Sequence, residues 1–202
     1  MKLKKYVKLL SYFIIFTLIL SSNIGASMPN MVKIVTEKGI LHTVQYDNFD
    51  LNVEKIKIEG NNDIVYCLEI DKKYPSGQSF LLNGTNNESI NNMIAAGYPN
   101  RSVTELKLND ENEAYSATQI AIWSLVQGYD VNKIKGNNPK IVEAIRNIYN
   151  DGVSGKYKNI IQSNIYKTSD QSVQEVIVIS HGDLMAEEKA ESEQVEYPAQ
   201  EG

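Results

Sequence analysis

The sequence has too few cysteines to form a disulfide within the chain. Its 202 residues contain one cysteine, Cys67, and two histidines, His42 and His181. A site built from clustered cysteine and histidine ligands is therefore not expected, and we predict no metal and no cofactor. The formal net charge is −5, so the chain also lacks the basic excess of nucleic-acid-binding proteins. We expect no nucleic acid partner.

The N-terminus has the three-part pattern of a secretory signal peptide. A lysine-rich leader, Lys2 to Lys8, precedes an apolar run from Leu9 to Leu20, and small residues up to Ala26 follow. The apolar run is too short for a comfortable membrane span, so an uncleaved anchor is the weaker alternative. We therefore predict a signal peptide over residues 1–26, export from the cell and no further contact with a membrane.

A lone cysteine in an exported protein leaves three interpretations. Cys67 could be an inert buried thiol, could form an intermolecular disulfide, or could be a reactive group. In a predicted strand from Ile64 to Ile70, alternation places Cys67 on the more polar face, with Val65 and Glu69. This placement weakens the interpretation as a buried core thiol without excluding it.

The order of the predicted elements favours an α+β fold. Strands come first, helices follow, and a last strand closes the chain. The predicted strands are Val32–Val35, Leu41–Tyr46, Val53–Ile58, Ile64–Ile70 and Ser172–Ser180, and the predicted helices are Ser89–Ala96, Tyr115–Gln127 and a helix beginning at Asn138-Pro139. We predict one domain over residues 27–182 and an acidic, disordered tail or linker over residues 183–202.

Four short motifs resemble those of one known family. Tyr66-Cys67-Leu68-Glu69 is an aromatic-Cys-hydrophobic-acid motif, and Thr118-Gln119-Ile120-Ala121-Ile122-Trp123 is a Thr-Gln-x-Ala-hydrophobic-Trp motif. Val173-Gln174-Glu175-Val176-Ile177-Val178 fits a hydrophobic-Gln-x-x-hydrophobic-hydrophobic motif, and Gly97-Tyr98-Pro99 lies between the first two. In this order, over residues 30–182, the motifs resemble those of the thioester (TQXA) domains of Gram-positive surface adhesins.

The resemblance implies an internal thioester between Cys67 and Gln174. In that family the motif cysteine condenses with the amide of the third-motif glutamine, and ammonia leaves. The thioester then acylates an amine on a host protein, most plausibly a lysine. Each molecule reacts once, so the domain is not an enzyme with turnover. The implied fold is an antiparallel β-barrel or sandwich with a helical insertion between the Cys-bearing and the Gln-bearing strands.

Other motif residues are given supporting roles. Gln119 is the rival acyl donor, although the family's central motif is mainly architectural. Trp123 is expected to pack in the core, and so is Tyr66, which points away from Cys67 by alternation. Thr118 either helps to start its helix or makes a hydrogen bond near the thioester. Glu69 either tunes protonation near Cys67 or is an exposed strand charge.

Two alternatives to the adhesin remain open on the sequence alone. One is a non-covalent secreted binding module with an inert Cys67. The other is a cysteine hydrolase using His42 or His181, for which no signature surrounds Cys67. We expect a monomer that is displayed on the bacterial cell wall. Because the chain shows neither a Leu-Pro-x-Thr-Gly motif nor a terminal apolar segment, it would be the tip of a longer stalk or be attached in another way.

Overall fold

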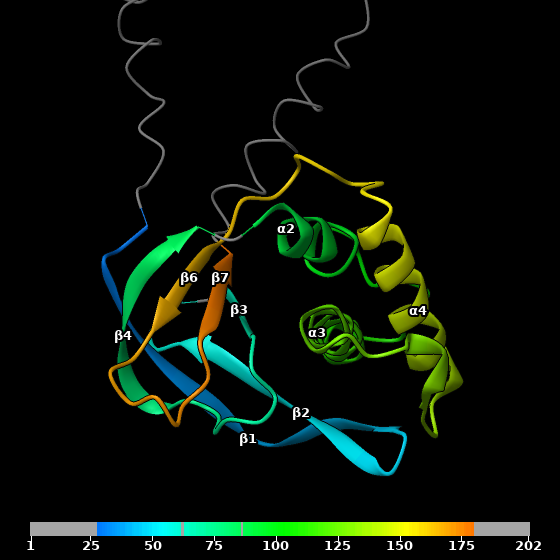
Figure 1. The fold of residues 1–202 in the computed structure, drawn as a ribbon, viewed down its shortest axis with the longest axis horizontal. Helices are drawn as coiled ribbons and strands as arrows, with labels where there is room; N and C mark the ends of the chain where they lie inside the picture. The colour runs from blue at the N-terminus through cyan, green and yellow to red at the C-terminus, as the bar shows by residue number, and fades with distance from the viewer. Residues whose placement is uncertain (1–27, 62, 86, 180–202) are drawn as a thin grey trace, which may run out of the picture.

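A ring of antiparallel strands lies beside three helices in the described part of the chain (Figure 1). The computed structural model describes residues 28–61, 63–85 and 87–179. The predicted signal peptide and the predicted acidic tail both lie outside these residues, as does His181. The prediction of an α+β fold with helices between the Cys-bearing and Gln-bearing strand regions is confirmed.

Seven strands form one sheet that closes on itself. In chain order they are β1 (Met31–Tyr46), β2 (Phe49–Ile58), β3 (Ile64–Cys67), β4 (Ser76–Thr85), β5 (Ile134–Lys135), β6 (Asn164–Lys167) and β7 (Val176–Ile179). Their spatial order is β2-β3-β7-β6-β4-β1-β5, and a further pairing of β2 with β1 closes the ring. The short β5 extends the sheet at the Tyr46 end of β1. Closure leaves few free strand edges for other chains to pair with.

The first strands differ from the prediction. The two predicted strands Val32–Val35 and Leu41–Tyr46 belong to one long strand, β1, whose register shifts between Thr36 and His42. Gly39 lies in this irregular stretch with φ of 102°, a conformation that glycine adopts without steric cost. The glycine therefore marks a bulge within one strand, where the sequence suggested the end of a strand.

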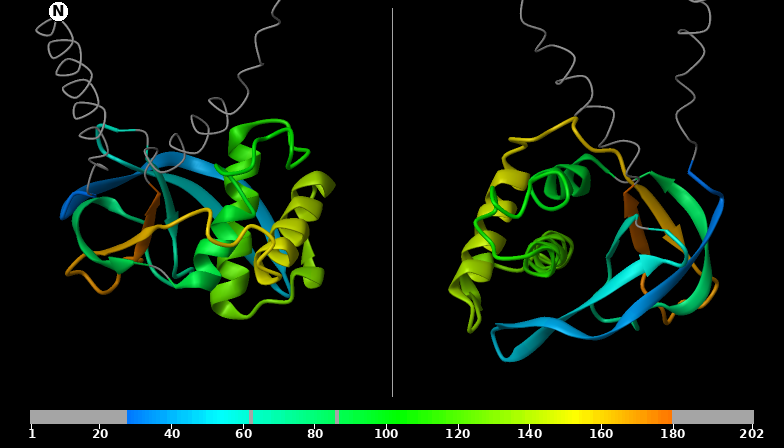
Figure 2. Two further views of the ribbon diagram at one scale, coloured as in Figure 1. Left: turned by 90° about the horizontal axis from the view of Figure 1, so that it is seen from above. Right: turned by 180° about the vertical axis from the view of Figure 1, so that it is seen from behind.

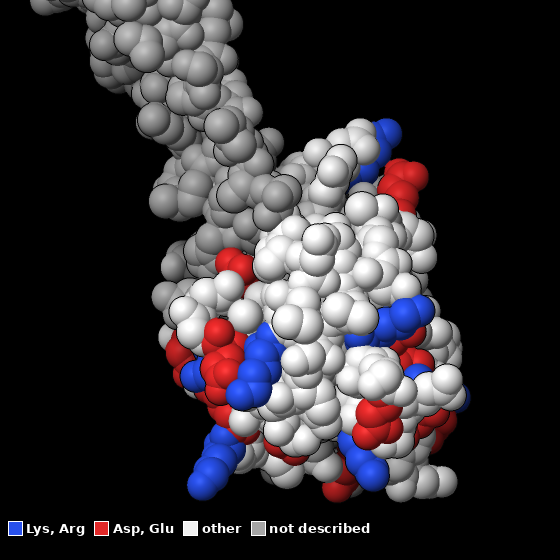
Figure 3. Space-filling model, turned by 90° about the vertical axis from the view of Figure 1, so that its left-hand side faces the viewer, with Lys and Arg blue, Asp and Glu red and all other residues white. Residues whose placement is uncertain are grey.

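Strand β4 was missed because its sequence lacks the pattern of a half-buried strand. It runs through segments that the sequence suggested were loops, and Phe80 is its one buried side chain. Its outer face is exposed, and Leu81 lies opposite Met31 of β1 with more than half of each side chain accessible. Figure 3 shows that uncharged side chains cover much of the face on this side of the ring. The three helices lie on the opposite side (Figure 1).

The helices are α2 (Glu88–Ala95), α3 (Glu111–Gln127) and α4 (Pro139–Val153), and a 3-10 turn, Val131–Lys133, links the last two. Helix α3 begins four residues before the predicted start, because the Asp110 side chain accepts a hydrogen bond from the Glu113 amide. It ends at Gly128 with φ of 69°, as predicted. Helix α4 begins at Asn138-Pro139, also as predicted. No described helix is long and apolar enough to cross a membrane.

Helix α3 lies between the strand ring and α4, so nearly all of it is buried (Figures 1 and 2). Every residue from 113 to 124 is buried, including five polar ones: Glu113, Ser116, Thr118, Gln119 and Ser124. A buried polar side chain is costly unless it forms hydrogen bonds. Gln119 satisfies this requirement by binding the backbone of Cys67, whereas Ser116 Oγ has no hydrogen-bond partner in the described structure.

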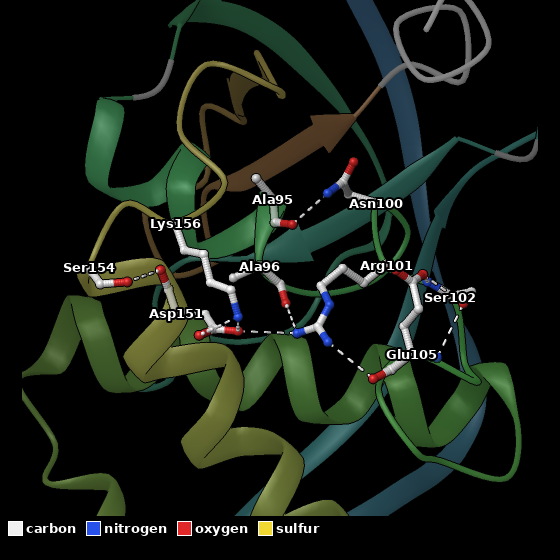
Figure 4. A network of polar contacts seen from close by, with 9 residues as sticks. All are labelled: Ala95, Ala96, Asn100, Arg101, Ser102, Glu105, Asp151, Ser154 and Lys156. Atoms are coloured by element: carbon white, nitrogen blue, oxygen red, sulfur yellow. Dashed lines mark hydrogen bonds and ion pairs between the residues drawn. The ribbon is translucent and has the colours of Figure 1, made fainter. Parts of the chain in front are cut away.

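A network around Arg101 joins the end of α2 to α4 (Figure 4). The Arg101 guanidinium donates to the Ala96 and Glu105 carbonyl oxygens and lies 3.4 Å from an Asp151 carboxylate oxygen. The Arg101 side chain is 15% exposed, whereas Lys156, which pairs with the same carboxylate at 3.1 Å, is 55% exposed. The two cations share one acidic partner but differ in burial.

We predict that Arg101→Ala lowers the free energy of unfolding by about 1.5–3 kcal/mol, because hydrogen bonds to a buried charged group are lost. The matched variant Lys156→Ala removes an exposed ion pair and should cost at most about 0.5 kcal/mol. Urea denaturation of the two variants measures the difference. Equal losses would show that burial does not set the strength of this network.

Candidate functional site

Cys67 is the last residue of β3 and its side chain is fully buried. Its cross-strand partner is Val176 of β7. The predicted strand continued to Ile70, with Cys67 on a more polar face, and both expectations are wrong. Other elements cover both faces of β3. The alternation of polar and apolar residues along this strand therefore does not indicate which side chains are exposed. Burial raises the pKa of the Cys67 thiol well above its usual value, and the negative charge of Glu54 raises it further.

The side-chain amide of Gln119 binds the backbone of Cys67. Cys67 N–H donates to Gln119 Oε1 at 2.8 Å, and Gln119 Nε2 donates to the Cys67 carbonyl oxygen at 2.8 Å. The amide takes the position that a neighbouring strand would otherwise occupy, and it satisfies both backbone groups of the cysteine. Gln119 therefore holds Cys67 in place through the peptide backbone.

Tyr115 makes a similar contact one helical turn before Gln119. Its hydroxyl donates to the Val65 carbonyl oxygen at 2.8 Å and accepts from Ile56 N–H at 3.4 Å. Strands β2 and β3 pair only at Ile56–Val65 and Lys57–Ile64, so they separate beyond this point. Tyr115 was not recognised from the sequence, although residues four apart share one face of a helix.

The Tyr74 side chain binds the backbone of β2 beyond the point where β2 and β3 stop pairing. Its hydroxyl donates to the Asn52 carbonyl oxygen at 2.9 Å and accepts from Glu54 N–H at 3.2 Å. Burial raises the pKa of Tyr74, and the charges of Cys67 and Glu54 raise it further. Tyr74 was also missed, because it follows a charged loop and belongs to no recognisable motif.

Gln174 lies in the extended segment that leads into β7. The predicted strand began at Ser172, but β7 begins at Val176. Gln174 is 1% exposed, and its backbone N–H donates to the Lys73 carbonyl oxygen at 3.0 Å. Its side-chain oxygen is buried and has no hydrogen-bond partner in the described structure. Because it lies two positions before Val176, the partner of Cys67, Gln174 is a diagonal neighbour of Cys67 along the paired segments.

Glu69 holds the segment that contains Gln174. One carboxylate oxygen accepts from Glu175 N–H at 2.9 Å, and the other lies 2.7 Å from Lys72 Nζ. A further backbone bond, from Leu68 N–H to the Glu175 carbonyl oxygen at 3.0 Å, joins the same two segments. The interpretation of Glu69 as an exposed strand charge is therefore wrong, since its side chain is 29% exposed and binds backbone.

The Gly97-Tyr98-Pro99 loop packs tightly on α3. Thr118 Oγ1 accepts from Tyr98 N–H at 2.9 Å, and a Cβ atom added at Gly97 would lie 2.5 Å from Thr118 Oγ1. Thr118 lies inside α3, which begins at Glu111, so the expectation that it starts the helix is wrong. Its hydroxyl binds this loop. The Tyr66 hydroxyl donates to the Tyr98 carbonyl oxygen at 2.6 Å.

Tyr66 and Trp123 are fully buried, as expected for core residues. The Tyr66 ring stacks on Tyr115 with centroids 4.8 Å apart and an interplanar angle of 19°. Alternation along β3 directs Tyr66 toward α3 and Cys67 toward the opposite face. Trp123 Nε1 is buried without a hydrogen-bond partner in the described structure.

No group of three or more histidine, cysteine, aspartate or glutamate side chains is placed to hold a metal among residues 28–61, 63–85 and 87–179. His42 lies on β1 opposite Val53. No hydrogen bond or ion pair joins it to Cys67 in the described part of the chain.

A polar groove of ≈ 520 Å³ opens beside Gln174. Its lining includes both neighbours of Gln174, Val173 and Glu175, together with Lys72, Lys167 and Asp170. Gln174 itself is not part of this lining. The Cys67 and Gln174 side chains themselves remain below the surface.

Comparisons with known proteins agree with this arrangement. The sequence model of the thioester domain family, TED, matches residues 64–154, which contain Cys67 and Gln119. A search of curated proteins finds no match. Among solved structures, the N-terminal thioester domain of a Clostridium perfringens surface protein has a TM-score of 0.54 and 18% identity, covering 74% of this chain and 98% of that one.

Two further solved structures have the same fold. The N-terminal domain of the Streptococcus pyogenes pilus tip adhesin Cpa has a TM-score of 0.51 and 17% identity, covering 77% of this chain and 96% of that one. The Bacillus anthracis TIE protein has a TM-score of 0.56 and 20% identity, covering 70% of this chain. This match spans 25% of the B. anthracis protein.

The family match covers the cysteine motif and the Thr-Gln motif, and Gln174 lies outside it. Residues 64–154 of the chain match the thioester domain family, and the chain has the fold of thioester domains from Gram-positive surface proteins.

Proposed function

We propose that Cys67 and Gln174 form an internal thioester, through which this domain acylates an amine on a protein of the host surface or extracellular matrix. The observation that carries the proposal is the contrast between the two buried glutamines. Both polar atoms of the Gln119 amide bind the Cys67 backbone, whereas the Gln174 side-chain oxygen has no partner in the described structure. Gln174 is therefore the glutamine whose amide group is uncommitted.

The arrangement of the backbone supports the same pair. Cys67 lies opposite Val176, and backbone bonds from Leu68 to Glu175 and from Gln174 to Lys73 fix the two segments together. A side-chain amide is a poor electrophile, so attack by the thiol requires the reacting atoms to be held close together. Rigid, hydrogen-bonded segments provide this positioning better than free loops.

The reaction balances without an external reagent. Cys67 Sγ attacks Cδ of Gln174, the bond from Cδ to Nε2 breaks, and the thiol proton leaves with the nitrogen as ammonia. In the second step a lysine Nζ of the target attacks Cδ, an amide forms, and the Cys67 thiol is restored. Each domain therefore reacts once, which supports a function in covalent attachment without turnover.

Burial and the groove support storage of the bond until a partner arrives. Cys67 is fully buried and Gln174 is 1% exposed, so bulk water has little access to the thioester. The groove that contains Val173 and Glu175 offers a path for a lysine side chain. One structural relative is a pilus tip adhesin, which supports a host protein as the partner and display at the cell surface.

The intact mass of the exported protein tests the thioester. We expect a mass lower than the calculated one by one ammonia, no thiol that reacts before denaturation, and uptake of one methylamine. Cys67→Ala should have its full calculated mass and take up no methylamine. A full mass with a titratable thiol in the folded wild-type protein would favour the alternative of a non-covalent binding module.

A matched pair of variants identifies the acyl donor. Gln174→Glu and Gln119→Glu are nearly isosteric with the wild type, but neither new carboxyl group can lose ammonia. We expect Gln174→Glu to abolish the ammonia loss and Gln119→Glu to retain it. Gln119→Glu also loses the donor to the Cys67 carbonyl oxygen, which should lower the free energy of unfolding by about 1–3 kcal/mol. The reverse pattern of masses would assign the acyl role to Gln119.

A further inference from the structure

The thioester reaction proposed above requires a proton acceptor near Cys67. A thiolate is the nucleophilic form of cysteine, but burial raises the pKa of the Cys67 thiol, so the thiol is protonated at neutral pH. The proton must therefore move at the moment of attack, and the leaving nitrogen must gain one. Of the two histidines, His42 lies in the described residues, and it forms no hydrogen bond or ion pair with Cys67 there. Among the described groups, the acid whose charge acts on the thiol is Glu54.

The register of β2 and β3 brings Glu54 to Cys67. Ile56 pairs with Val65, and both side chains are buried in the ring. Pairing ends at Ile56–Val65, and this register continued by two residues along each strand brings Glu54 to the level of Cys67. The negative charge of Glu54 also raises the pKa of the Cys67 thiol, which indicates that the two groups lie near each other. The strands separate at this point, where Gln119 binds the Cys67 backbone.

The Glu54 carboxylate is uncommitted. Glu54 is half-buried, and no hydrogen bond or ion pair involves its carboxylate within residues 28–61, 63–85 and 87–179. Its backbone is nevertheless fixed, because Glu54 N–H donates to the Tyr74 hydroxyl at 3.2 Å. Two other half-buried acidic groups, Glu69 and Asp151, bind a cation or the backbone. A positioned but unpaired carboxylate beside a buried thiol is able to exchange protons.

The other titratable groups that bear on Cys67 cannot accept the proton. They are Tyr74, which follows β3, and Tyr115 on α3. Burial raises the pKa of both phenols, so both stay protonated, and each hydroxyl already binds two backbone groups. Val176, the partner of Cys67 on β7, is apolar. Glu54 is the remaining base among the described residues that interact electrostatically with the thiol.

We propose that Glu54 transfers the proton in both steps of the reaction. In thioester formation the carboxylate takes the Sγ proton as sulfur attacks Cδ of Gln174. It then gives this proton to the leaving nitrogen, and ammonia departs. In acylation Glu54 takes a proton from the attacking amine and returns it to the sulfur of Cys67. Glu54 gives up in each step the proton that it took, so no other reactant is required.

The rates of opening and re-forming the thioester test this role in the exported full-length protein. Added ammonia opens the bond and restores the thiol and the Gln174 amide, and removal of ammonia allows the thioester to form again. Intact mass follows both directions. General acid–base catalysis contributes about 10²–10⁴-fold, so Glu54→Gln should slow opening and re-formation by at least about 100-fold. The fraction of thioester at equilibrium should not change, because a proton carrier affects both directions equally.

Two controls separate proton transfer from structural damage. Glu59→Gln changes an exposed carboxylate just after β2 that pairs with Lys33, and it should react at the wild-type rate. Glu54→Ala leaves space for a small acid, so added formate should accelerate its reaction in proportion to the formate concentration. Formate should not accelerate the wild type or Glu59→Gln.

The outcomes distinguish this proposal from the one on which it rests. If the folded wild type has its full calculated mass, the thioester itself is contradicted. If the wild type contains the thioester and folded Glu54→Gln reacts at the wild-type rate, Glu54 is not the proton carrier. If Glu54→Gln does not fold, the change in the reaction rate of Glu54→Ala on adding formate tests whether Glu54 carries the proton. Absence of rescue in folded Glu54→Ala contradicts the proposal, and rescue supports it.

Discussion

The two hydrogen bonds between the Gln119 amide and the Cys67 backbone determine how the rest of the site is built. At Cys67 the strand β3 has left its neighbour β2, so a buried N–H and a buried carbonyl oxygen would otherwise lack partners. Leaving both unsatisfied would cost about 1–3 kcal/mol each. Gln119 supplies both partners from a helix, and one turn earlier the Tyr115 hydroxyl donates to the Val65 carbonyl oxygen and accepts from Ile56 N–H. Helix α3 therefore replaces part of a strand.

This replacement leaves the site fully buried. A continuous β2–β3 pair would place backbone beside Cys67, whereas here side chains of α3 bind the β3 backbone and the Tyr74 hydroxyl binds β2 at Glu54. Burial keeps water away from the proposed thioester, but it also keeps the thiol neutral. The same environment that preserves the bond therefore makes a nearby base necessary for its formation.

Much of the architecture could be predicted from the sequence, because it depends on local signals. Gly128 and Asn138-Pro139 mark helix boundaries, and the α+β order follows from the sequence of strands and helices. The glutamine motifs were found through resemblance to a family. Strand β4 and the burial of Cys67 could not be predicted, because exposure in a closed ring depends on which elements cover each face.

The supporting residues were harder to predict for a related reason. Glu69 resembles a solvent-exposed charge until the Glu175 backbone is placed beside it, and Thr118 resembles a cap until the Tyr98 loop is packed on its helix. Glu54 and Tyr74 belong to no motif, although Tyr74 lies only five residues after Glu69. Tyr74 meets Glu54 through a side-chain hydrogen bond that forms only when the loop after β3 packs on β2.

The most direct test of the account is a crystal structure of the exported protein at a resolution that separates bonded from non-bonded atoms. The account predicts continuous electron density between Cys67 Sγ and Cδ of Gln174, with no Nε2 atom on Gln174 and with the Gln119 amide still bound to the Cys67 backbone. Separate density for a free Cys67 thiol and an intact Gln174 amide, or a bond from Cys67 to Gln119, would contradict it.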